Sequence, residues 1–324
     1  METNNKKTIL VTGSAGSIGF HTAKRLLENG QIVIGADNFN DYYDPSLKEA
    51  RNAILEGFKG YKLYRGDLSD ESLVEQIFTD NKIDQICHLA AQAGVRYSLE
   101  NPQVYIKSNI NAFLNILEAA RNFNTPDLVY ASSSSVYGSN QKVPFSVNDS
   151  VDNPISLYAA TKKADELMAY TYSHLFGINT TGLRFFTVIG PYGRPDMAPI
   201  LFASAIFKGE EIKVFNFGKM KRDFTYIDDI VDGILLALEK TNGYQIFNLG
   251  NNKPVELEYF ISCIEEEIGK TAKKKYMELQ PGDVLETFAD TSHTTEILGW
   301  EPKTSTEKAI KAFIGWYNEY YGDK

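Results

Sequence analysis

The sequence predicts an α/β fold, with a doubly wound parallel sheet followed by a smaller C-terminal α/β lobe. Two observations predict it. Short β-branched apolar runs alternate with helical stretches along most of the chain. A glycine-rich turn joins the first strand to the first helix, as in sheets that bind nucleotides.

The elements follow one another in the order that such a sheet requires. Residues 8–12 (TILVT) are typical of a buried strand, and a helical pattern extends from the glycine turn to Gly30. A second strand is expected over residues 31–36. Later strand-like runs span residues 61–64, 85–89, 128–131, 180–186 and 245–249, and long helical patterns span residues 104–123 and 158–176.

The glycine turn is a candidate dinucleotide site. Its glycines allow a tight turn, and the positive end of the next helix can face a pyrophosphate. The second strand ends at Asp37, which lies 18 residues after Gly19. A carboxylate there can bond both hydroxyls of an adenosine ribose and repels a 2′-phosphate. The expected cofactor is therefore NAD rather than NADP.

Tyr158 and Lys162 are the most informative pair in the chain. They are four residues apart, so a helix places them on one face, one turn from each other. A lysine ammonium near a phenol favours the phenolate, which can accept a proton from a sugar or alcohol hydroxyl. Ser133, at the end of a strand-like run, can hold the same oxygen. With a nicotinamide cofactor, these three residues predict hydride removal from a carbinol.

Composition and charge disfavour several classes of protein. The chain has 324 residues, a net charge of −9 and an isoelectric point near 5.1, which disfavours nucleic acids and anionic membranes as partners. No segment approaches the roughly 18 apolar residues of a membrane span, so a cytoplasmic location is expected. The histidines lack metal spacing, so no metal is expected. Cys87 and Cys263 are expected to be small buried side chains.

Two sets of residues identify a resemblance. Gly13-x-x-Gly16-x-x-Gly19 and Tyr158-x-x-x-Lys162 resemble the extended short-chain dehydrogenase/reductase superfamily. Residues 37–48 (DNFNDYYDPSLK) and 184–198 (RFFTVIGPYGRPDMA) are more specific and resemble the UDP-glucuronate 4-epimerases. The resemblance covers nearly the whole chain.

The resemblance implies a domain organisation. A Rossmann-type NAD-binding domain is expected over residues 1–186 plus about 224–250. A UDP-sugar-binding lobe is expected over residues 187–223 plus 251–324. A homodimer through two helices per subunit is also implied.

The resemblance also implies the rest of the cofactor pocket. Asp67 would accept from the adenine amino group, although a helix N-cap role fits it as well. Ala90 and Ala91 would lie beside the nicotinamide ribose, whose hydroxyls Lys162 would bond. The expected cofactor-binding residues are Gly13, Gly16, Ser17, Ile18, Gly19, Asp37, Asn38, Asp67, Leu68, Ala90, Ala91, Asn109, Tyr158 and Lys162.

The substrate site is expected to hold a UDP-sugar. Arg222 would clamp the diphosphate, and Asp283 would engage the uridine ribose or orient Arg222. Arg96 would reach the diphosphate or a carboxylate, or have a structural role. The sugar would contact Ser133, Ser134, Ser135, Tyr158 and Thr187, with Arg194 close by.

The expected reaction converts UDP-glucuronate to UDP-galacturonate through a transient 4-keto sugar. That ketone is beta to the C6 carboxylate, so the intermediate can lose carbon dioxide. Hydroxyl groups must therefore hold the carboxylate so that its bond to C5 stays out of line with the carbonyl π system. Related UDP-glucuronate decarboxylases usually carry Glu just before the Val-Tyr-Gly segment, and sugar dehydratases carry Asp-Glu. Ser134 and Ser135 occupy those places here, so elimination and decarboxylation are disfavoured.

Three residues depart from the pattern of the relatives. Ser17 stands where an aromatic residue is usual, and Ile189 and Tyr192 stand where UDP-glucuronate epimerases usually have Tyr and Trp. A UDP-glucose or UDP-N-acetylhexosamine 4-epimerase therefore stays an alternative, with a UDP-glucuronate decarboxylase less favoured. A non-catalytic NAD-sensing protein is the alternative from another class.

Overall fold

The computed structural model describes residues 6–279 and 285–322, which form two compact units. The first unit contains the described residues up to Asn140, together with Ser150–Arg184 and Val231–Phe247. The second contains Gln141–Asp149, Phe185–Ile230 and the described chain from Asn248 onward. The binding role expected of each part stays a prediction. The assignment of residues 141–149 to the second unit was not foreseen from the sequence.

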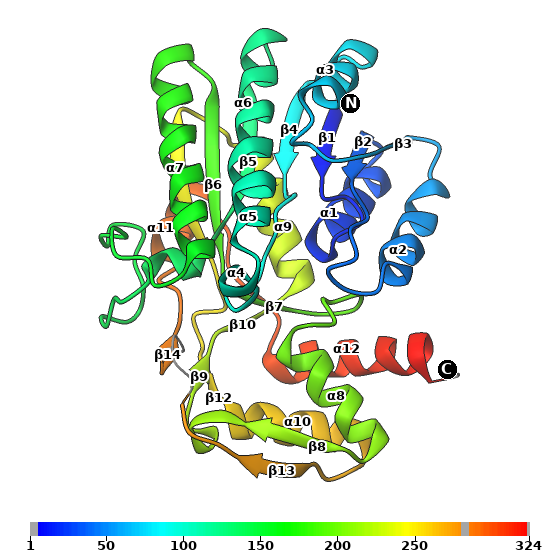
Figure 1. Ribbon diagram of the computed structural model, residues 1–324, viewed down its shortest axis with the longest axis vertical. Coiled ribbons are helices and arrows are strands. Elements are labelled where there is room, and N and C mark those ends of the chain that lie inside the picture. The colour runs from blue at the N-terminus through cyan, green and yellow to red at the C-terminus, as the bar shows by residue number, and fades with distance from the viewer. Residues whose placement is uncertain (1–5, 280–284, 323–324) are drawn as a thin grey trace. The chain divides into compact units, whose positions relative to one another are not determined.

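A parallel sheet forms the centre of the first unit (Figure 1). Among the described residues it has seven strands, in the order β11-β6-β5-β4-β1-β2-β3. The order reverses between β1 and β4, and in such sheets ligands bind at that point, beyond the carboxyl ends of the strands. The fold class predicted from the sequence is confirmed. The strands are β1 Thr8–Thr12, β2 Ile32–Asp37, β3 Tyr61–Arg65, β4 Gln85–His88, β5 Asp127–Ser133, β6 Asn179–Phe185 and β11 Tyr244–Leu249.

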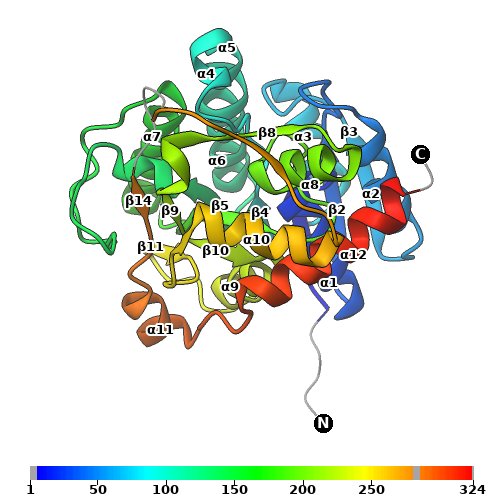
Figure 2. The same ribbon diagram turned by 90° about the horizontal axis from the view of Figure 1, so that it is seen from below.

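Helices cover both faces of this sheet (Figures 1 and 2). α3, α6 and α7 lie on one face, and α1 and α9 lie on the other. An ion pair of 3.0 Å between Arg25 Nη1 and Asp232 Oδ1 joins α1 to α9. The helical segments are α1 Ser17–Glu28, α2 Ser46–Glu56, α3 Glu71–Asp80, α4 Tyr97–Glu100, α5 Pro102–Tyr105, η1 Ile106–Asn111, α6 Ala112–Asn122, η2 Ser134–Tyr137, α7 Leu157–Phe176 and α9 Ile227–Glu239.

The core of the first unit lies between the sheet and the α6–α7 face. Leu10, Ile86 and Leu128 come from neighbouring strands and are fully buried against Phe113 and Leu117 of α6. Removing these large apolar side chains from water is the main stabilising term for the sheet. The helix predicted over residues 104–123 contains a π-helical turn, η1, between α5 and α6.

The second unit combines short strands with four longer helical segments among its described residues. Its core includes Phe224 and Phe260, whose rings stack with centroids 3.9 Å apart. The indole of Trp300 is buried and donates to Asp229 O at 2.8 Å. Its elements are β7 Thr187–Ile189, α8 Ala198–Lys208, β8 Glu211–Val214, η3 Phe215–Gly218, β9 Lys221–Arg222, β10 Phe224–Tyr226, β12 Val255–Glu256, α10 Leu257–Ile268, β13 Lys273–Tyr276, β14 Glu286–Thr287, α11 Ser292–Leu298 and α12 Thr306–Tyr321.

None of the helices in the described ranges combines the length and the apolar character that a bilayer span requires. Within the same ranges, no three His, Cys, Asp or Glu side chains gather closely enough to hold a metal ion.

Candidate active site

The turn between β1 and α1 is shaped for close contact with a ligand. Gly13 has φ +67°, and its amide donates to Ala36 O at 2.7 Å. A Cβ on Gly19 would lie 2.0 Å from Gly13 O, so only glycine fits there. α1 begins at Ser17, and the preceding Gly16 supplies no side-chain cap. The amides of the first helical turn, which include those of Ser17, Ile18 and Gly19, are therefore suited to bind an anionic group.

Asp37 ends β2 and lies beside this turn. Its carboxylate accepts from the amides of Ala15 at 3.1 Å and Phe39 at 2.8 Å. The side chain is buried, with 8% exposed. Asn38 follows on the surface and accepts from the Asn40 amide. Asp37 thus fixes both the glycine turn and the next loop, and the residues present suit an adenosine ribose at this place.

Asp67 and Leu68 follow β3. Asp67 accepts from the Ser69 amide at 2.9 Å and pairs with Lys107 at 2.9 Å. Partial burial tends to raise the pKa of Asp67, but these hydrogen bonds prevail and lower it. The N-cap of α3 is Asp70, so Asp67 makes an Asx turn and does not cap that helix. Leu68 is buried, and its contact with adenine stays a prediction.

Small residues after β4 let the backbone approach the glycine turn. A Cβ on Gly13 would lie 2.9 Å from Ala90 N, so the two segments are packed backbone to backbone. The hydroxyl of Thr12 accepts from Ala90 N at 3.1 Å and fixes this approach. Ala90 and Ala91 thus lie at the carboxyl end of the sheet, at the point where its strand order reverses.

Asn109 is buried in the π-helical turn η1 and braces the site. Its side chain accepts from Gln92 N at 2.8 Å and donates to Gln92 O at 3.1 Å. It also donates to the Thr161 hydroxyl at 3.0 Å. This side chain therefore joins the segment after β4 to α7. Neither Gln92 nor Thr161 was identified from the sequence.

Ser133 lies at the end of β5 with its hydroxyl prepared as a donor. Its Oγ accepts from the Ser135 amide at 3.2 Å and from the Ser135 hydroxyl at 2.8 Å. Because two donors already point at that oxygen, its own proton is directed elsewhere. Ser133 can therefore donate to a ligand oxygen. Ser134 and Ser135 form the start of η2.

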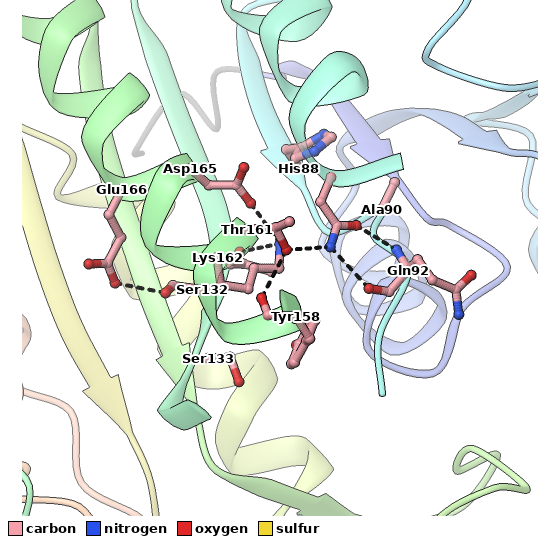
Figure 3. A network of polar contacts seen from close by, with 12 residues as sticks. His88, Ala90, Gln92, Ser132, Ser133, Tyr158, Thr161, Lys162, Asp165 and Glu166 are labelled. Atoms are coloured by element: carbon pink, nitrogen blue, oxygen red, sulfur yellow. Dashed lines mark hydrogen bonds and ion pairs between the residues drawn. The ribbon is translucent and has the colours of Figure 1, made fainter. Parts of the chain in front are cut away.

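Tyr158 and Lys162 lie on α7, near the carboxyl end of β5 (Figure 3). Ser156 caps the helix by accepting from Ala159 N at 3.1 Å. The Tyr158 ring packs edge-on against Tyr105, with centroids 6.1 Å apart. The Lys162 ammonium donates to Ala131 O at 3.0 Å and to Asp165 Oδ2 at 3.1 Å. One of its three N–H groups is left for the cofactor or the phenol.

Buried charges surround this pair. Glu166 receives two hydrogen bonds from Arg184, at 2.8 and 2.9 Å, and one from Ser132 at 2.8 Å. Burial, with the charge of Lys162, lowers the pKa of His88 to about 3, so this imidazole is neutral. Burial raises the pKa of Asp165 to about 6; the nearby Lys162 opposes this rise. Sequence reasoning missed Asp165, Glu166 and Arg184, although the first two follow Lys162 closely on the same helix.

The remaining candidate in the first unit lies away from this buried cluster. Arg96 is exposed and precedes α4, where its carbonyl accepts from Leu99 N at 3.0 Å. The expected contact of Arg96 with a diphosphate stays a prediction.

The other expected substrate residues belong to the second unit. Thr187 begins β7, and its amide donates to Asp223 O at 3.2 Å. Arg194 forms two hydrogen bonds with Asp196, at 3.1 and 2.6 Å. Arg222 lies on β9 and donates to Lys221 O at 2.9 Å. Asp283 lies outside the described residues.

Asp223 organises this part of the second unit and was not identified from the sequence. Its buried carboxylate accepts from the amides of Asn251 at 2.6 Å, Asn252 at 3.0 Å and Ala289 at 3.0 Å. Burial raises the pKa of Asp223, while these amides act in the opposite direction. The side chain of Asp223, the residue after Arg222, therefore fixes the backbone at residues 251–252 and 289.

The chain is similar to known proteins over most of its length. A family model described as the NAD dependent epimerase/dehydratase family matches residues 9–250. UDP-glucuronate 4-epimerase 4 of Arabidopsis thaliana is 49% identical, over 99% of this chain and 78% of that protein.

Two crystal structures are similar over almost the whole chain, each with a TM-score of 0.89. The first is UDP-glucuronic acid 4-epimerase of Bacillus cereus with UDP-glucuronic acid and NAD; it is 32% identical over 97% of this chain and 100% of that one. The second is UDP-glucose 4-epimerase of Thermotoga maritima with UDP-glucose; it is 31% identical over 97% of this chain and 99% of that one.

Proposed function

Because this chain belongs to the NAD-dependent epimerase/dehydratase family and is a UDP-sugar 4-epimerase, an isomerase, we propose that it interconverts UDP-glucuronate and UDP-galacturonate. The observation that carries the choice of sugar is the hydroxyl-rich segment Ser133–Ser135 beside Tyr158 and Lys162. It offers hydrogen bonds to a carboxylate and contains no acid that would promote its loss.

The first step of the proposed reaction is proton removal by Tyr158. The phenolate accepts the proton of the sugar 4-hydroxyl, and the ammonium of Lys162 stabilises the phenolate beforehand. Ser133 donates to the same sugar oxygen and stabilises it as a carbonyl forms. NAD, when bound, would supply the hydride acceptor for C4 and, once reduced, the hydride donor for the opposite face of the ketone. Tyr158 then gives its proton back to the oxygen.

The intermediate is a 4-keto sugar whose C6 carboxylate must be held. Carbon dioxide leaves only if the bond between C5 and C6 lines up with the carbonyl π system. Ser134 and Ser135 donate hydrogen bonds to the carboxylate and hold the C5–C6 bond out of line with the carbonyl π system. Arg222 binds the diphosphate, and the cofactor stays bound through turnover.

A neutral UDP-sugar is the second candidate substrate. Two observations favour it: the similarity to a UDP-glucose 4-epimerase and the residues at positions 189 and 192. Ile189 is buried at the end of β7. The Tyr192 ring packs against Trp316, with centroids 5.0 Å apart. In the sequence, Ile189 and Tyr192 lie between Thr187 and Arg194, which are expected near the sugar.

The protein acts as a homodimer in the cytoplasm in this proposal. The dimer is supported by apolar side chains that α6 and α7 leave in solvent. Leu114 is 40% exposed, Leu167 is 56% exposed and Tyr170 is 53% exposed. A second copy of the same two helices would cover them.

An NMR time course with purified protein and UDP-glucuronate tests the substrate. We expect UDP-galacturonate to appear without release of carbon dioxide and without net formation of NADH. UDP-pentose as the main product would overturn the argument from the serines. Turnover of UDP-glucose or UDP-N-acetylglucosamine, with none of the acid, would establish the second candidate.

A further inference from the structure

We propose that Asp165 is a positioning residue that holds the Lys162 ammonium and offsets part of its charge. Asp165 thereby sets the pH at which the Tyr158–Lys162 pair becomes active. The proposal rests on the catalytic roles proposed for Tyr158 and Lys162. Asp165 itself lies outside the Tyr158-x-x-x-Lys162 motif.

The geometry places Asp165 one helical turn after Lys162, with both side chains inside the first unit (Figure 3). The ion pair is 3.1 Å long, and the two side chains are only 3% and 2% exposed. Ala131 O accepts a second hydrogen bond from the same ammonium. Two fixed acceptors therefore determine where the third N–H group points.

The environment of Asp165 destabilises the folded protein, so a contribution to stability does not explain why a carboxylate lies there. Its Oδ1 is buried and has no hydrogen-bond partner among the described residues. A buried carboxylate oxygen without a hydrogen bond destabilises the folded state, and each such oxygen in a native protein needs an explanation, for example a functional one. Glu166, the next residue on the helix, shows the contrast, because Arg184 and Ser132 bond its carboxylate.

The charged and titratable groups that act on Asp165, or on its neighbours Lys162 and Glu166, come from several elements. Lys162 and Glu166 lie on α7, Tyr130 on β5, His88 on β4 and Arg184 on β6. Arg184 balances Glu166, and His88 is neutral. Burial raises the pKa of Asp165 to about 6, so the charge of this carboxyl, 3.1 Å from the Lys162 ammonium, changes near neutral pH.

Ionisation of Asp165 has a defined effect on the chemistry. When Asp165 is neutral, the positive charge of Lys162 acts fully on the phenolate of Tyr158. When Asp165 is ionised, its negative charge opposes the phenolate and shifts base formation to higher pH. The two titrations are therefore coupled.

The test is the pH dependence of turnover in Asp165→Asn, measured with whichever UDP-sugar the wild-type enzyme converts. The amide keeps the shape and a hydrogen-bond acceptor for Lys162 but removes the charge. We expect the acid limb of the kcat profile to move down by about one pH unit. Asp165→Ser is also neutral and replaces this variant if the amide does not fold.

Glu166→Gln is the matched control, because it removes a neighbouring buried carboxylate that Arg184 already balances. We expect it to lower the melting temperature while leaving the acid limb in place. An acid limb that is unmoved in Asp165→Asn overturns the proposal. An equal shift in Glu166→Gln also overturns it, because the effect would not belong to Asp165. Failure of UDP-glucuronate as substrate affects neither comparison.

Discussion

At the scale of single residues, the chemistry depends on which atoms neighbours leave available. Ser135 directs two donors at the oxygen of Ser133, so the Ser133 proton is available to a ligand. Asp165 and Ala131 take two of the three N–H groups of Lys162. The site therefore presents one donor from Ser133 and one from Lys162.

Tyr158→Phe tests the proposed base. Loss of the hydroxyl should lower kcat by about 1,000-fold or more, because general acid–base catalysis contributes factors of this size. Bound NAD should stay, since the ring that packs on Tyr105 is retained. Turnover followed by NMR measures kcat, and cofactor released on denaturation measures bound NAD.

Tyr105→Phe is the control. It removes a hydroxyl that donates to Ala93 O at 3.0 Å, and its kcat should fall by less than about tenfold. Equal losses in the two variants would contradict the role of Tyr158.

Asp165 also makes a stability prediction. Its pKa is about 6 in the folded protein, against an ordinary value of 3.8. Between these two pH values the folded chain holds a proton that the unfolded chain has lost. The free energy of unfolding of the wild type should therefore fall, relative to Asp165→Asn, as the pH rises from 4 to 7. The change should be at most about 3 kcal/mol.

Urea unfolding of both proteins at several pH values in this range measures that difference. If the difference between the two proteins is constant with pH, Asp165 has the same pKa in the folded and the unfolded chain, which would contradict the raised pKa.

At the scale of elements, we expect the β1–α1 turn to decide whether a cofactor can bind. Gly19→Ala places a Cβ 2.0 Å from Gly13 O, so the turn must open. We expect the purified variant to carry little NAD, with affinity at least about 100-fold weaker, because the amides of the helix terminus no longer converge. NAD released by denaturation, counted per subunit, is the measurement.

Gly315→Ala is the control for this substitution. Gly315 lies inside α12, and a Cβ there meets no atom within 4 Å. The control should keep its NAD and gain up to about 1 kcal/mol of stability, because alanine favours a helix interior over glycine. Full NAD occupancy in Gly19→Ala would show that the turn does not hold the cofactor.

At the scale of the whole molecule, the exposed faces of α6 and α7 predict a dimer. Leu167→Lys places a charge in that interface, and burial of one leucine contributes roughly 1.5–3 kcal/mol. With two copies per dimer, the dissociation constant should rise at least about 100-fold. Light scattering after size exclusion measures the mass. Leu201→Lys, which changes a leucine that is 54% exposed on α8, should stay dimeric. A monomeric wild type, or a dimeric Leu167→Lys, would contradict the interface.

The sequence by itself determined the parts that depend on local pattern. Strand runs, the glycine turn and the four-residue spacing of Tyr158 and Lys162 are properties of short segments. For this reason the predicted strands agree with the structure to within one or two residues at each end. The π-helical turn η1 escaped prediction, because apolar periodicity does not separate a π turn from an α-helix.

Only the tertiary structure decided how the site is supported. Asn109 joins Gln92 to Thr161, which lies 52 residues after Asn109, and Arg184 balances Glu166 across 18 residues. Neither pairing has a local signal, because these partners come together only when the sheet and its helices pack. The same packing leaves Asp165 buried beside Lys162. Burial in a low-dielectric interior, which no sequence pattern states, gives that carboxylate its raised pKa.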